Sequence, residues 1–243
     1  MKLINLGAGL EHILDTELIN DDSVIIDAGA NIGEFVEKMR TITNAKIYSI
    51  ECSAYNYKVL CEKQYENVKT YERALVGTKV DKVTLTEYAG KPKSDGHPRF
   101  NQWCNIYDNY NERFTADPDV KVVKYDVGTI TLSELIKENN IQSIDYLKMD
   151  VEGAEYDIIE NLTQEEADII KQISMEPHDR SKNTAMVQKL ENLGFFVISF
   201  PALDNPSVGE YYAYKPEAML INLKHKDLNG LKVKTGKNFK IFG

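Results

Sequence analysis

Residues 24–33, with the sequence VIIDAGANIG, most constrain what this chain can fold into. The apolar run predicts a buried strand that ends at Asp27, and a helical pattern begins near Ile32. A glycine-rich turn between a strand and a helix can direct backbone N–H groups at an anionic group. Gly29 allows a tight turn or a close approach to a ligand, and Gly33 allows the helix to lie against the sheet. The stretch therefore predicts a site for a nucleoside-containing cofactor.

Strand and helix patterns alternate after this turn. Strands are expected at residues 24–27, 45–50 and 68–71, separated by a helix to about residue 41 and a helix over residues 53–65 with Ser53 as its N-cap. This β-α-β-α-β order is typical of a doubly wound parallel sheet in an α/β domain. Further strands are expected at residues 83–86, 120–124, 144–149, 173–175, 195–200 and 217–223. Further helices are expected at residues 131–139 with a capping box, after residue 150 to about 162, and at 182–193 before Gly194.

Three segments depart from this alternation within a single domain over residues 1–243. Residues 1–22 carry a weak helical pattern and are expected to cover one edge of the domain. Residues 89–120 lack periodicity, and a loop of this length in a compact domain is often functional, so we expect an insertion that caps a site or a lid that only packs on the sheet. From residue 224 onward six lysines and one acid predict a solvated tail or edge strand, or else a patch for an anionic partner.

Composition excludes several classes of protein. The formal net charge of −9 argues against general nucleic-acid binding, which needs a basic surface. No apolar run has the length of a transmembrane segment, and the N-terminus does not resemble a secretory signal. The three cysteines show no CxxC spacing, so neither a disulfide framework nor a zinc site is expected, and a reducing cytoplasm is the expected location.

Four expected strands end in acids, at Asp27, Glu51, Asp150 and Glu176. Ligands of open α/β sheets bind outside the carboxyl ends of the strands, so these acids are expected to converge on one site. Glu51 lies 22 residues after Gly29, where a carboxylate can accept both ribose hydroxyls of an adenosine. This position fits either a dinucleotide or S-adenosylmethionine.

The spacing of the glycines in the turn favours S-adenosylmethionine over a dinucleotide. The GxGxxG fingerprint of dinucleotide sites is incomplete, because its middle glycine is absent between Gly29 and Gly33. Asn31 and Asp27 fit a zwitterionic amino-acid end better. Asp27 is expected to face an ammonium group while the turn amides face a carboxylate.

With these residues in place, the chain resembles the FkbM family of S-adenosylmethionine-dependent methyltransferases. The resemblance covers about residues 22–200 and rests on the segments VIIDAGANIGEF (24–35), IYSIE (47–51), RALVG (73–77), IDYLKMDVEGAEYDII (144–159), SMEPH (174–178) and LENLGFFV (190–197). It implies a Rossmann-like, mostly parallel seven-stranded sheet with an antiparallel last strand, helices on both faces, and here an inserted ribbon and loop at about residues 76–124. It also implies methylation of a hydroxyl, often on a sugar or a polyketide-type product.

The resemblance also implies roles for individual residues. The turn that binds the methionine end of the cofactor is formed by Asp27, Gly29, Ala30, Asn31 and Gly33. The ribose acid is Glu51, followed by Cys52 where many members have proline. Ala74 and Leu75 stand beside the adenine, and Asp150 faces the methyl group. Residues 89–120 match no part of the family pattern, which leaves the acceptor open.

Methyl transfer to a hydroxyl needs alignment of the acceptor oxygen and a base for its proton. Candidate bases are Asp150, Glu152, Glu176 and His178, of which His178 can titrate near neutrality and Glu152 is otherwise a helix cap. Lys148 shares a strand face with Asp150, and either holds a carboxylate or the nascent alkoxide or forms a salt bridge within the sheet.

The four candidate bases could instead bind Mg²⁺, although no compact ligand motif supports a metal. Trp103 or a tyrosine of the insertion is a candidate for stacking on a sugar ring.

Three functions remain open from the sequence. The first is O-methylation of a glycan or a small hydroxylated molecule. The second is methylation of a nitrogen, lipid or peptide acceptor. The third is a nucleotide-binding protein of the same fold, either an NAD oxidoreductase or a non-catalytic binder. The oligomeric state is not indicated.

Overall fold

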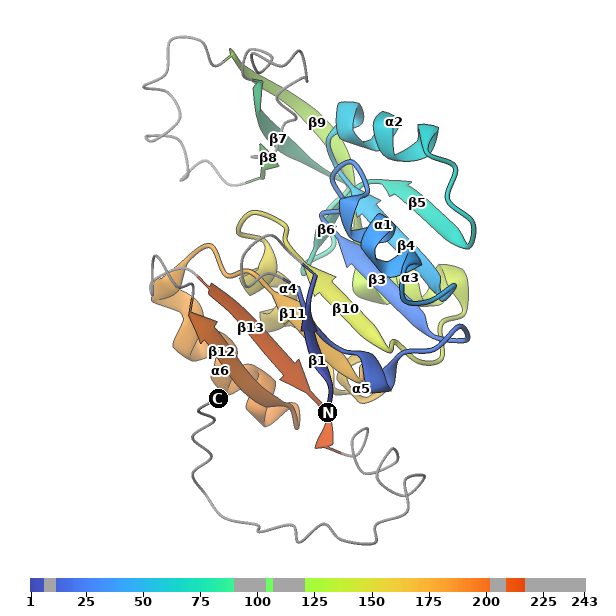
Figure 1. Ribbon diagram of the computed structural model, residues 1–243. Coiled ribbons are helices and arrows are strands. Elements are labelled where there is room, and N and C mark those ends of the chain that lie inside the picture. Colours follow the sequence, from blue (N-terminus) through green and yellow to red (C-terminus); the bar gives the residue numbers. More distant parts are fainter. Residues whose placement is uncertain (7–11, 90–103, 107–120, 202–208, 217–243) are drawn as a thin grey trace, which may run out of the picture.

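The computed structural model describes residues 1–6, 12–89, 104–106, 121–201 and 209–216 (Figure 1). Its centre is a seven-stranded sheet with the order β12-β13-β11-β10-β3-β4-β5. The strands are β3 (Val24–Ala28), β4 (Lys46–Glu51), β5 (Val68–Glu72), β10 (Tyr146–Met149), β11 (Gln172–Met175), β12 (Phe196–Pro201) and β13 (Gly209–Tyr214). Only β13 runs antiparallel to its neighbours in this sheet. This confirms the mostly parallel sheet with an antiparallel last strand.

Helices cover both faces of the sheet (Figure 1). They are α1 (Glu34–Arg40), α2 (Ala54–Glu62), α3 (Leu132–Asn139), α4 (Glu155–Asn161), α5 (Gln164–Ile169) and α6 (Asn183–Asn192). One apolar core joins α1 to Ile25, Ile47 and Tyr146, and the other joins α3, α4, α5 and α6 to alternate residues such as Ile26 and Leu147. Because successive side chains of a strand point to opposite faces, both cores form from one set of strands.

Most expected elements are present within a few residues. Ser53 caps α2 by accepting a hydrogen bond from the Asn56 N–H, and Thr131 and Glu134 form the capping box of α3. Gly194 has a φ of 88° directly after the end of α6, as a helix-ending glycine requires. The structure adds α5 and β13, which the sequence patterns did not predict, while the strand expected at residues 217–223 lies outside the described residues.

The helical expectation for residues 1–22 is wrong where the structure describes them. Strands β1 (Leu3–Asn5) and β2 (Ile13–Asp15) pair antiparallel and precede a short 3₁₀ turn, Thr16–Leu18. Leu6 and Leu14 pack into the core on the α1 face of the sheet. Packing of these apolar residues against the sheet overrides the weak local helical periodicity.

A second, four-stranded sheet has the order β6-β9-β7-β8, with strands β6 (Ala74–Val76), β7 (Lys82–Ala89), β8 (Cys104–Asn105) and β9 (Lys121–Thr131). Strand β9 is longer than the expected 120–124, because it pairs with β7 along that strand's whole length and then with β6. Residues 90–103 and 107–120 of the expected insertion, including Trp103, lie outside the described residues, as does the lysine-rich stretch from residue 224. No described helix is long and apolar enough to span a membrane.

Candidate active site

The turn after β3 is closed tightly against two neighbouring strand ends. Gly29 has a φ of 76°, and a Cβ atom there would lie 1.8 Å from the carbonyl oxygen of Asp150. The N–H groups of Gly29 and Ala30 both donate to the Ile50 carbonyl at 3.0 Å. The Asn31 N–H donates to Glu51 Oε2 at 2.7 Å. The expectation that these amides face a cofactor carboxylate is therefore wrong, because β4 already accepts all three of them.

Lys148 lies beneath this turn and is 2% exposed. Its ammonium group forms an ion pair with Asp27 Oδ1 at 3.1 Å and donates to the Gly29 carbonyl at 2.6 Å. Burial would lower the pKa of Lys148, but Asp27 and Asp150 raise it above its ordinary value, so the group is charged at neutral pH. The structure thus gives Lys148 its alternative role, a salt bridge within the sheet. Its partner is the fully buried Asp27, which was expected to face an ammonium group of the cofactor.

Glu51 is the last residue of β4, and it lines the cleft described below. Its carboxylate is held by two backbone donors, the Asn31 N–H and the Ser53 N–H, each at 2.7 Å. Burial raises the pKa of Glu51 to about 7, despite these hydrogen bonds. A carboxylate has about four lone-pair positions, so each oxygen can accept one further hydrogen bond. Two adjacent hydroxyls, such as those of a ribose, match that remaining capacity.

A cleft of about 610 Å³, measured with its open mouth, lies at the carboxyl ends of β3, β4 and β10. It brings together eight of the residues expected from the sequence, namely Gly29, Asn31, Glu51, Cys52, Ala74, Leu75, Asp150 and Glu152. Ala30 and Gly33 do not line it; Gly33 is the N-cap residue of α1. The lining is completed by six residues that were not expected from the sequence, namely Ile50, Asn56, Arg73, Ile106, Val151 and Ala154.

The missed lining residues carry different signals. Arg73 and Ile50 are direct neighbours of expected residues, so their place was accessible from the sequence. Ile106 follows β8 within the expected insertion and is half-buried against the second sheet. Its position shows that the described part of the insertion borders the cleft.

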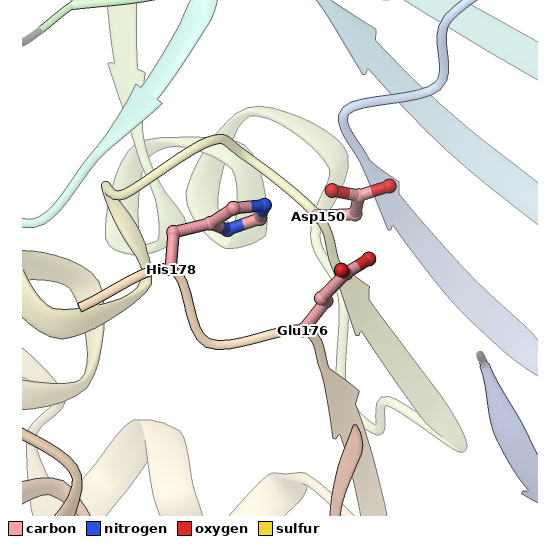
Figure 2. Close-up of side chains that lie close together, drawn as sticks. All are labelled: Asp150, Glu176 and His178. Carbon is pink, nitrogen blue, oxygen red and sulfur yellow. The ribbon is translucent and has the colours of Figure 1, made fainter. Parts of the chain in front are cut away.

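Three side chains, one of which is Asp150 of the cleft lining, meet beside the cleft (Figure 2). Asp150 follows β10, while Glu176 and His178 follow β11, and their ligand atoms all lie within 4.8 Å of one another. The parallel register places Met149 beside Met175, so the next residues, Asp150 and Glu176, leave the sheet side by side. These two strand-end acids converge as the sequence analysis expected.

His178 is fixed between two carboxylates. Its Nδ1 lies 3.0 Å from Glu155 Oε1, and its Nε2 lies 3.4 Å from Glu152 Oε2. Burial would lower the pKa of His178, but Glu155 and Glu152 raise it to about 10. The histidine is therefore protonated at neutral pH in this arrangement. This differs from the expectation that it titrates near neutrality and removes it as a free base.

Glu152 and Glu155 shape the loop between β10 and α4. Glu155 is fully buried, and its two oxygens accept hydrogen bonds from the Val151 and Gly153 N–H groups at 3.0 and 2.9 Å. Glu152 has a φ of 52°, a left-handed conformation that is uncommon for a residue with a side chain. Burial, with smaller contributions from Asp150, Glu155 and Glu176, raises the pKa of Glu152 to about 8, although the nearby His178 opposes this rise. The loop thus concentrates acids around one histidine.

The order of the central sheet, its single reversed strand β13 and the cleft beside a buried acid at the end of β4 define a class I, Rossmann-like methyltransferase. The chain belongs to the FkbM methyltransferase family, since the family described as "Methyltransferase FkbM domain" matches residues 27–197. That range includes the turn, the cleft and the cluster of Asp150, Glu176 and His178. Members of this family are S-adenosylmethionine-dependent, which fits the residues of the cleft.

Two relatives in sequence agree with this assignment. The chain is 28% identical over 207 residues to "Methyltransferase sdnD" of Sordaria araneosa, covering 76% of this chain and 78% of that protein. It is 26% identical over 211 residues to "Methyltransferase 1" of Beauveria bassiana (strain ARSEF 2860), covering 81% and 82%. Among solved structures it is similar to methyltransferase FkbM from Methylobacillus flagellatus KT, with a TM-score of 0.49 and 11% identity over 81% of this chain and 44% of that one. These names state methyl transfer and leave the acceptor open.

Proposed function

We propose that this methyltransferase transfers a methyl group to a hydroxyl oxygen of a sugar or another hydroxylated small molecule. The observation that carries the proposal is the meeting of Asp150 and Glu176 beside the cleft, where both carboxylates follow strands that fix their backbones. A hydroxyl loses its proton as it is methylated, and a carboxylate at this place is a suitable acceptor for that proton.

The cleft offers S-adenosylmethionine separate places for its ribose, its adenine and its methyl group. Glu51 would bind the ribose hydroxyls with its unused lone pairs. Ala74 and Leu75, both nearly buried, would pack against the adenine, and Asp150 and Glu152 border the end where the methyl group would lie. When bound, S-adenosylmethionine would supply an activated methyl group: the bond from its methyl carbon to sulfur would break as the bond to the acceptor oxygen forms, a neutral thioether would leave, and the hydroxyl proton would pass to a carboxylate.

The chain's own contribution is positioning and proton acceptance. Asp150 touches both the cleft and the acid cluster, so its carboxylate lies where an acceptor oxygen must approach. Lys148 and Asp27 do not reach that space; they hold the turn that forms one wall of the cleft. Orientation and proton transfer are each able to account for large rate enhancements.

Replacing Asp150 with Asn tests this assignment. We expect kcat for methylation of a hydroxyl acceptor to fall about 10²- to 10⁴-fold, with the dissociation constant of S-adenosylhomocysteine changed by less than about threefold. Transfer of a labelled methyl group to a panel of sugars, polyols and amines measures the first quantity, and calorimetry measures the second. The exposed Glu160 on α4 provides the control, since Glu160→Gln should alter neither. Transfer to amines but to none of the hydroxyl acceptors would contradict the proposal.

Cofactor affinity should also depend on pH through Glu51. With a pKa of about 7, the Glu51 carboxyl is about one-tenth ionised at pH 6 and nine-tenths ionised at pH 8. Because the ionised form accepts ribose hydrogen bonds better, we expect S-adenosylhomocysteine to bind about tenfold more tightly at pH 8 than at pH 6. Calorimetry across this range measures the slope, and Glu51→Gln should flatten it. An affinity in the unaltered protein that is constant or falls with pH would assign the ribose to another group.

A further inference from the structure

We propose that Asp150, Glu176 and His178 bind a divalent first-row cation, with Mn²⁺ as the natural probe, beside the cofactor cleft. The binding of the cation follows from the geometry of these residues alone. Its role in catalysis rests on the proposed O-methyltransferase function.

The three side chains have the composition and the spacing of a metal site. Two carboxylates and one imidazole suit cations such as Mn²⁺, which accepts both oxygen and nitrogen ligands. Their ligand atoms lie within 4.8 Å of one another, and small side-chain rotations would bring them to the separations of about 3 Å found around a bound ion (Figure 2). The backbones of the two acids are held in place by hydrogen bonds, since the Asp150 N–H donates to the Ala28 carbonyl and the Glu176 N–H donates to the Met149 carbonyl.

The orientation of His178 is set by a buried carboxylate outside the cluster. Glu155 Oε1 lies 3.0 Å from His178 Nδ1 and is itself tied to the Val151 and Gly153 N–H groups. A carboxylate on the second ring nitrogen is the usual partner of a metal-bound histidine, since it fixes the tautomer and the ring plane. A cation would bind at Nε2 in place of the proton that His178 carries in the metal-free arrangement. Glu152, which lies 3.4 Å from Nε2, would have to turn away or become a further ligand.

A separate observation comes from the neighbouring strand β13. Its register pairs Met175 with Tyr211, so Glu210 stands beside Glu176 on the same face of the sheet. Glu210 is 1% exposed, and its Oε2 has no hydrogen-bond partner among the described residues. A buried acid with an unsatisfied oxygen is costly unless it is protonated or positive charge lies near it. Lys148 already pairs with Asp27, so a cation at the cluster would supply that charge.

A cation at this place would narrow the class of acceptor. Coordination of a hydroxyl oxygen to a divalent ion lowers the pKa of that hydroxyl and orients it. Three protein ligands leave several positions of an octahedral ion open, so an acceptor with two adjacent oxygens, such as a vicinal diol, would bind through both. Under the proposed function, the favoured acceptors are therefore polyhydroxylated molecules rather than isolated alcohols.

The test uses Mn²⁺ alone with the metal-stripped full-length chain and requires no acceptor. Calorimetry should show one equivalent of Mn²⁺ bound, and Glu176→Gln and His178→Asn should each weaken binding by about 10- to 100-fold. Glu160→Gln is the control carboxylate and should bind Mn²⁺ as the unaltered chain does. Pulsed electron paramagnetic resonance of the unaltered protein should show a directly bound imidazole nitrogen, which keeps the test valid if a variant fails to fold.

The outcomes separate this proposal from the proposed function. No saturable Mn²⁺ binding, binding that survives both substitutions, or a spectrum without a coordinated nitrogen would each overturn the cation site. Full hydroxyl methylation by the metal-stripped enzyme would overturn the catalytic role of the cation and leave O-methylation standing. Mn²⁺ binding at the cluster in a protein that methylates only amines would keep the site and overturn O-methylation.

Discussion

Replacing Lys148 with Met is expected to destabilise the protein by about 3–5 kcal/mol, because the change leaves the Asp27 carboxylate buried without its partner. Asp27 is fully buried, and its other described contact is a long hydrogen bond of 3.5 Å from Ser49. The substitution also removes the donor to the Gly29 carbonyl, so the wall of the cofactor cleft should loosen. Urea denaturation with and without S-adenosylhomocysteine would measure both effects.

Two comparisons isolate the buried charge as the cause. Lys171 forms a similar pair with Asp145, but its side chain is 42% exposed, so Lys171→Met should cost about 1 kcal/mol or less. The double variant Asp27→Asn with Lys148→Met removes both charges and should recover much of the lost stability. A loss below about 1 kcal/mol for Lys148→Met would show that Asp27 is neutral in the folded protein.

The sequence predicted the sheet well because strand and helix periodicities are local properties. The alternation over residues 24–71 and the capping residues Ser53 and Thr131 needed no knowledge of distant segments. Strand β13, with the sequence GEYYAY, was missed since its aromatic side chains and Glu210 become intelligible only when it lies between β11 and β12. Helix α5 has six residues, too few to show a clear helical period.

The residues of the candidate site could be predicted from the sequence, but the role of each residue could be predicted less well. Acids at the ends of parallel strands must share one edge of the sheet, so Glu51, Asp150 and Glu176 could be grouped from spacing alone. Partner choice depends on register between distant segments, which spacing does not reveal. The pairing of β10 with β3 sets Lys148 opposite Asp27. The two form an ion pair, so the Asp27 carboxylate does not face the ammonium group of a cofactor as expected. His178 was likewise expected to act as a base, but the structure pairs it with the buried Glu155 and with Glu152, whose backbone is left-handed.

Replacing Gly29 with Ala is expected to cost about 2–5 kcal/mol and to abolish measurable binding of S-adenosylhomocysteine. Two separate penalties contribute. A residue with a side chain pays about 1–2 kcal/mol for the left-handed backbone at φ 76°. The added methyl group would also lie 1.8 Å from the Asp150 carbonyl oxygen, so the end of β10 must move. Overpacking that shifts backbone typically costs a further 1–3 kcal/mol.

Gly194 provides the matched control, because it separates backbone strain from this close approach. It has a φ of 88°, yet among the residues that the structure describes an added Cβ would meet only the end of the Lys215 side chain, at 3.3 Å. Gly194→Ala should therefore lose only the stability due to backbone strain, about 1–2 kcal/mol, and should bind S-adenosylhomocysteine as the unaltered protein does. Equal losses of stability in the two variants would mean that the Asp150 carbonyl yields without cost. Since Asp150 also belongs to the cleft and to the proposed cation site, a larger loss at Gly29 would show that one contact between the β3 turn and the end of β10 sets the geometry of both.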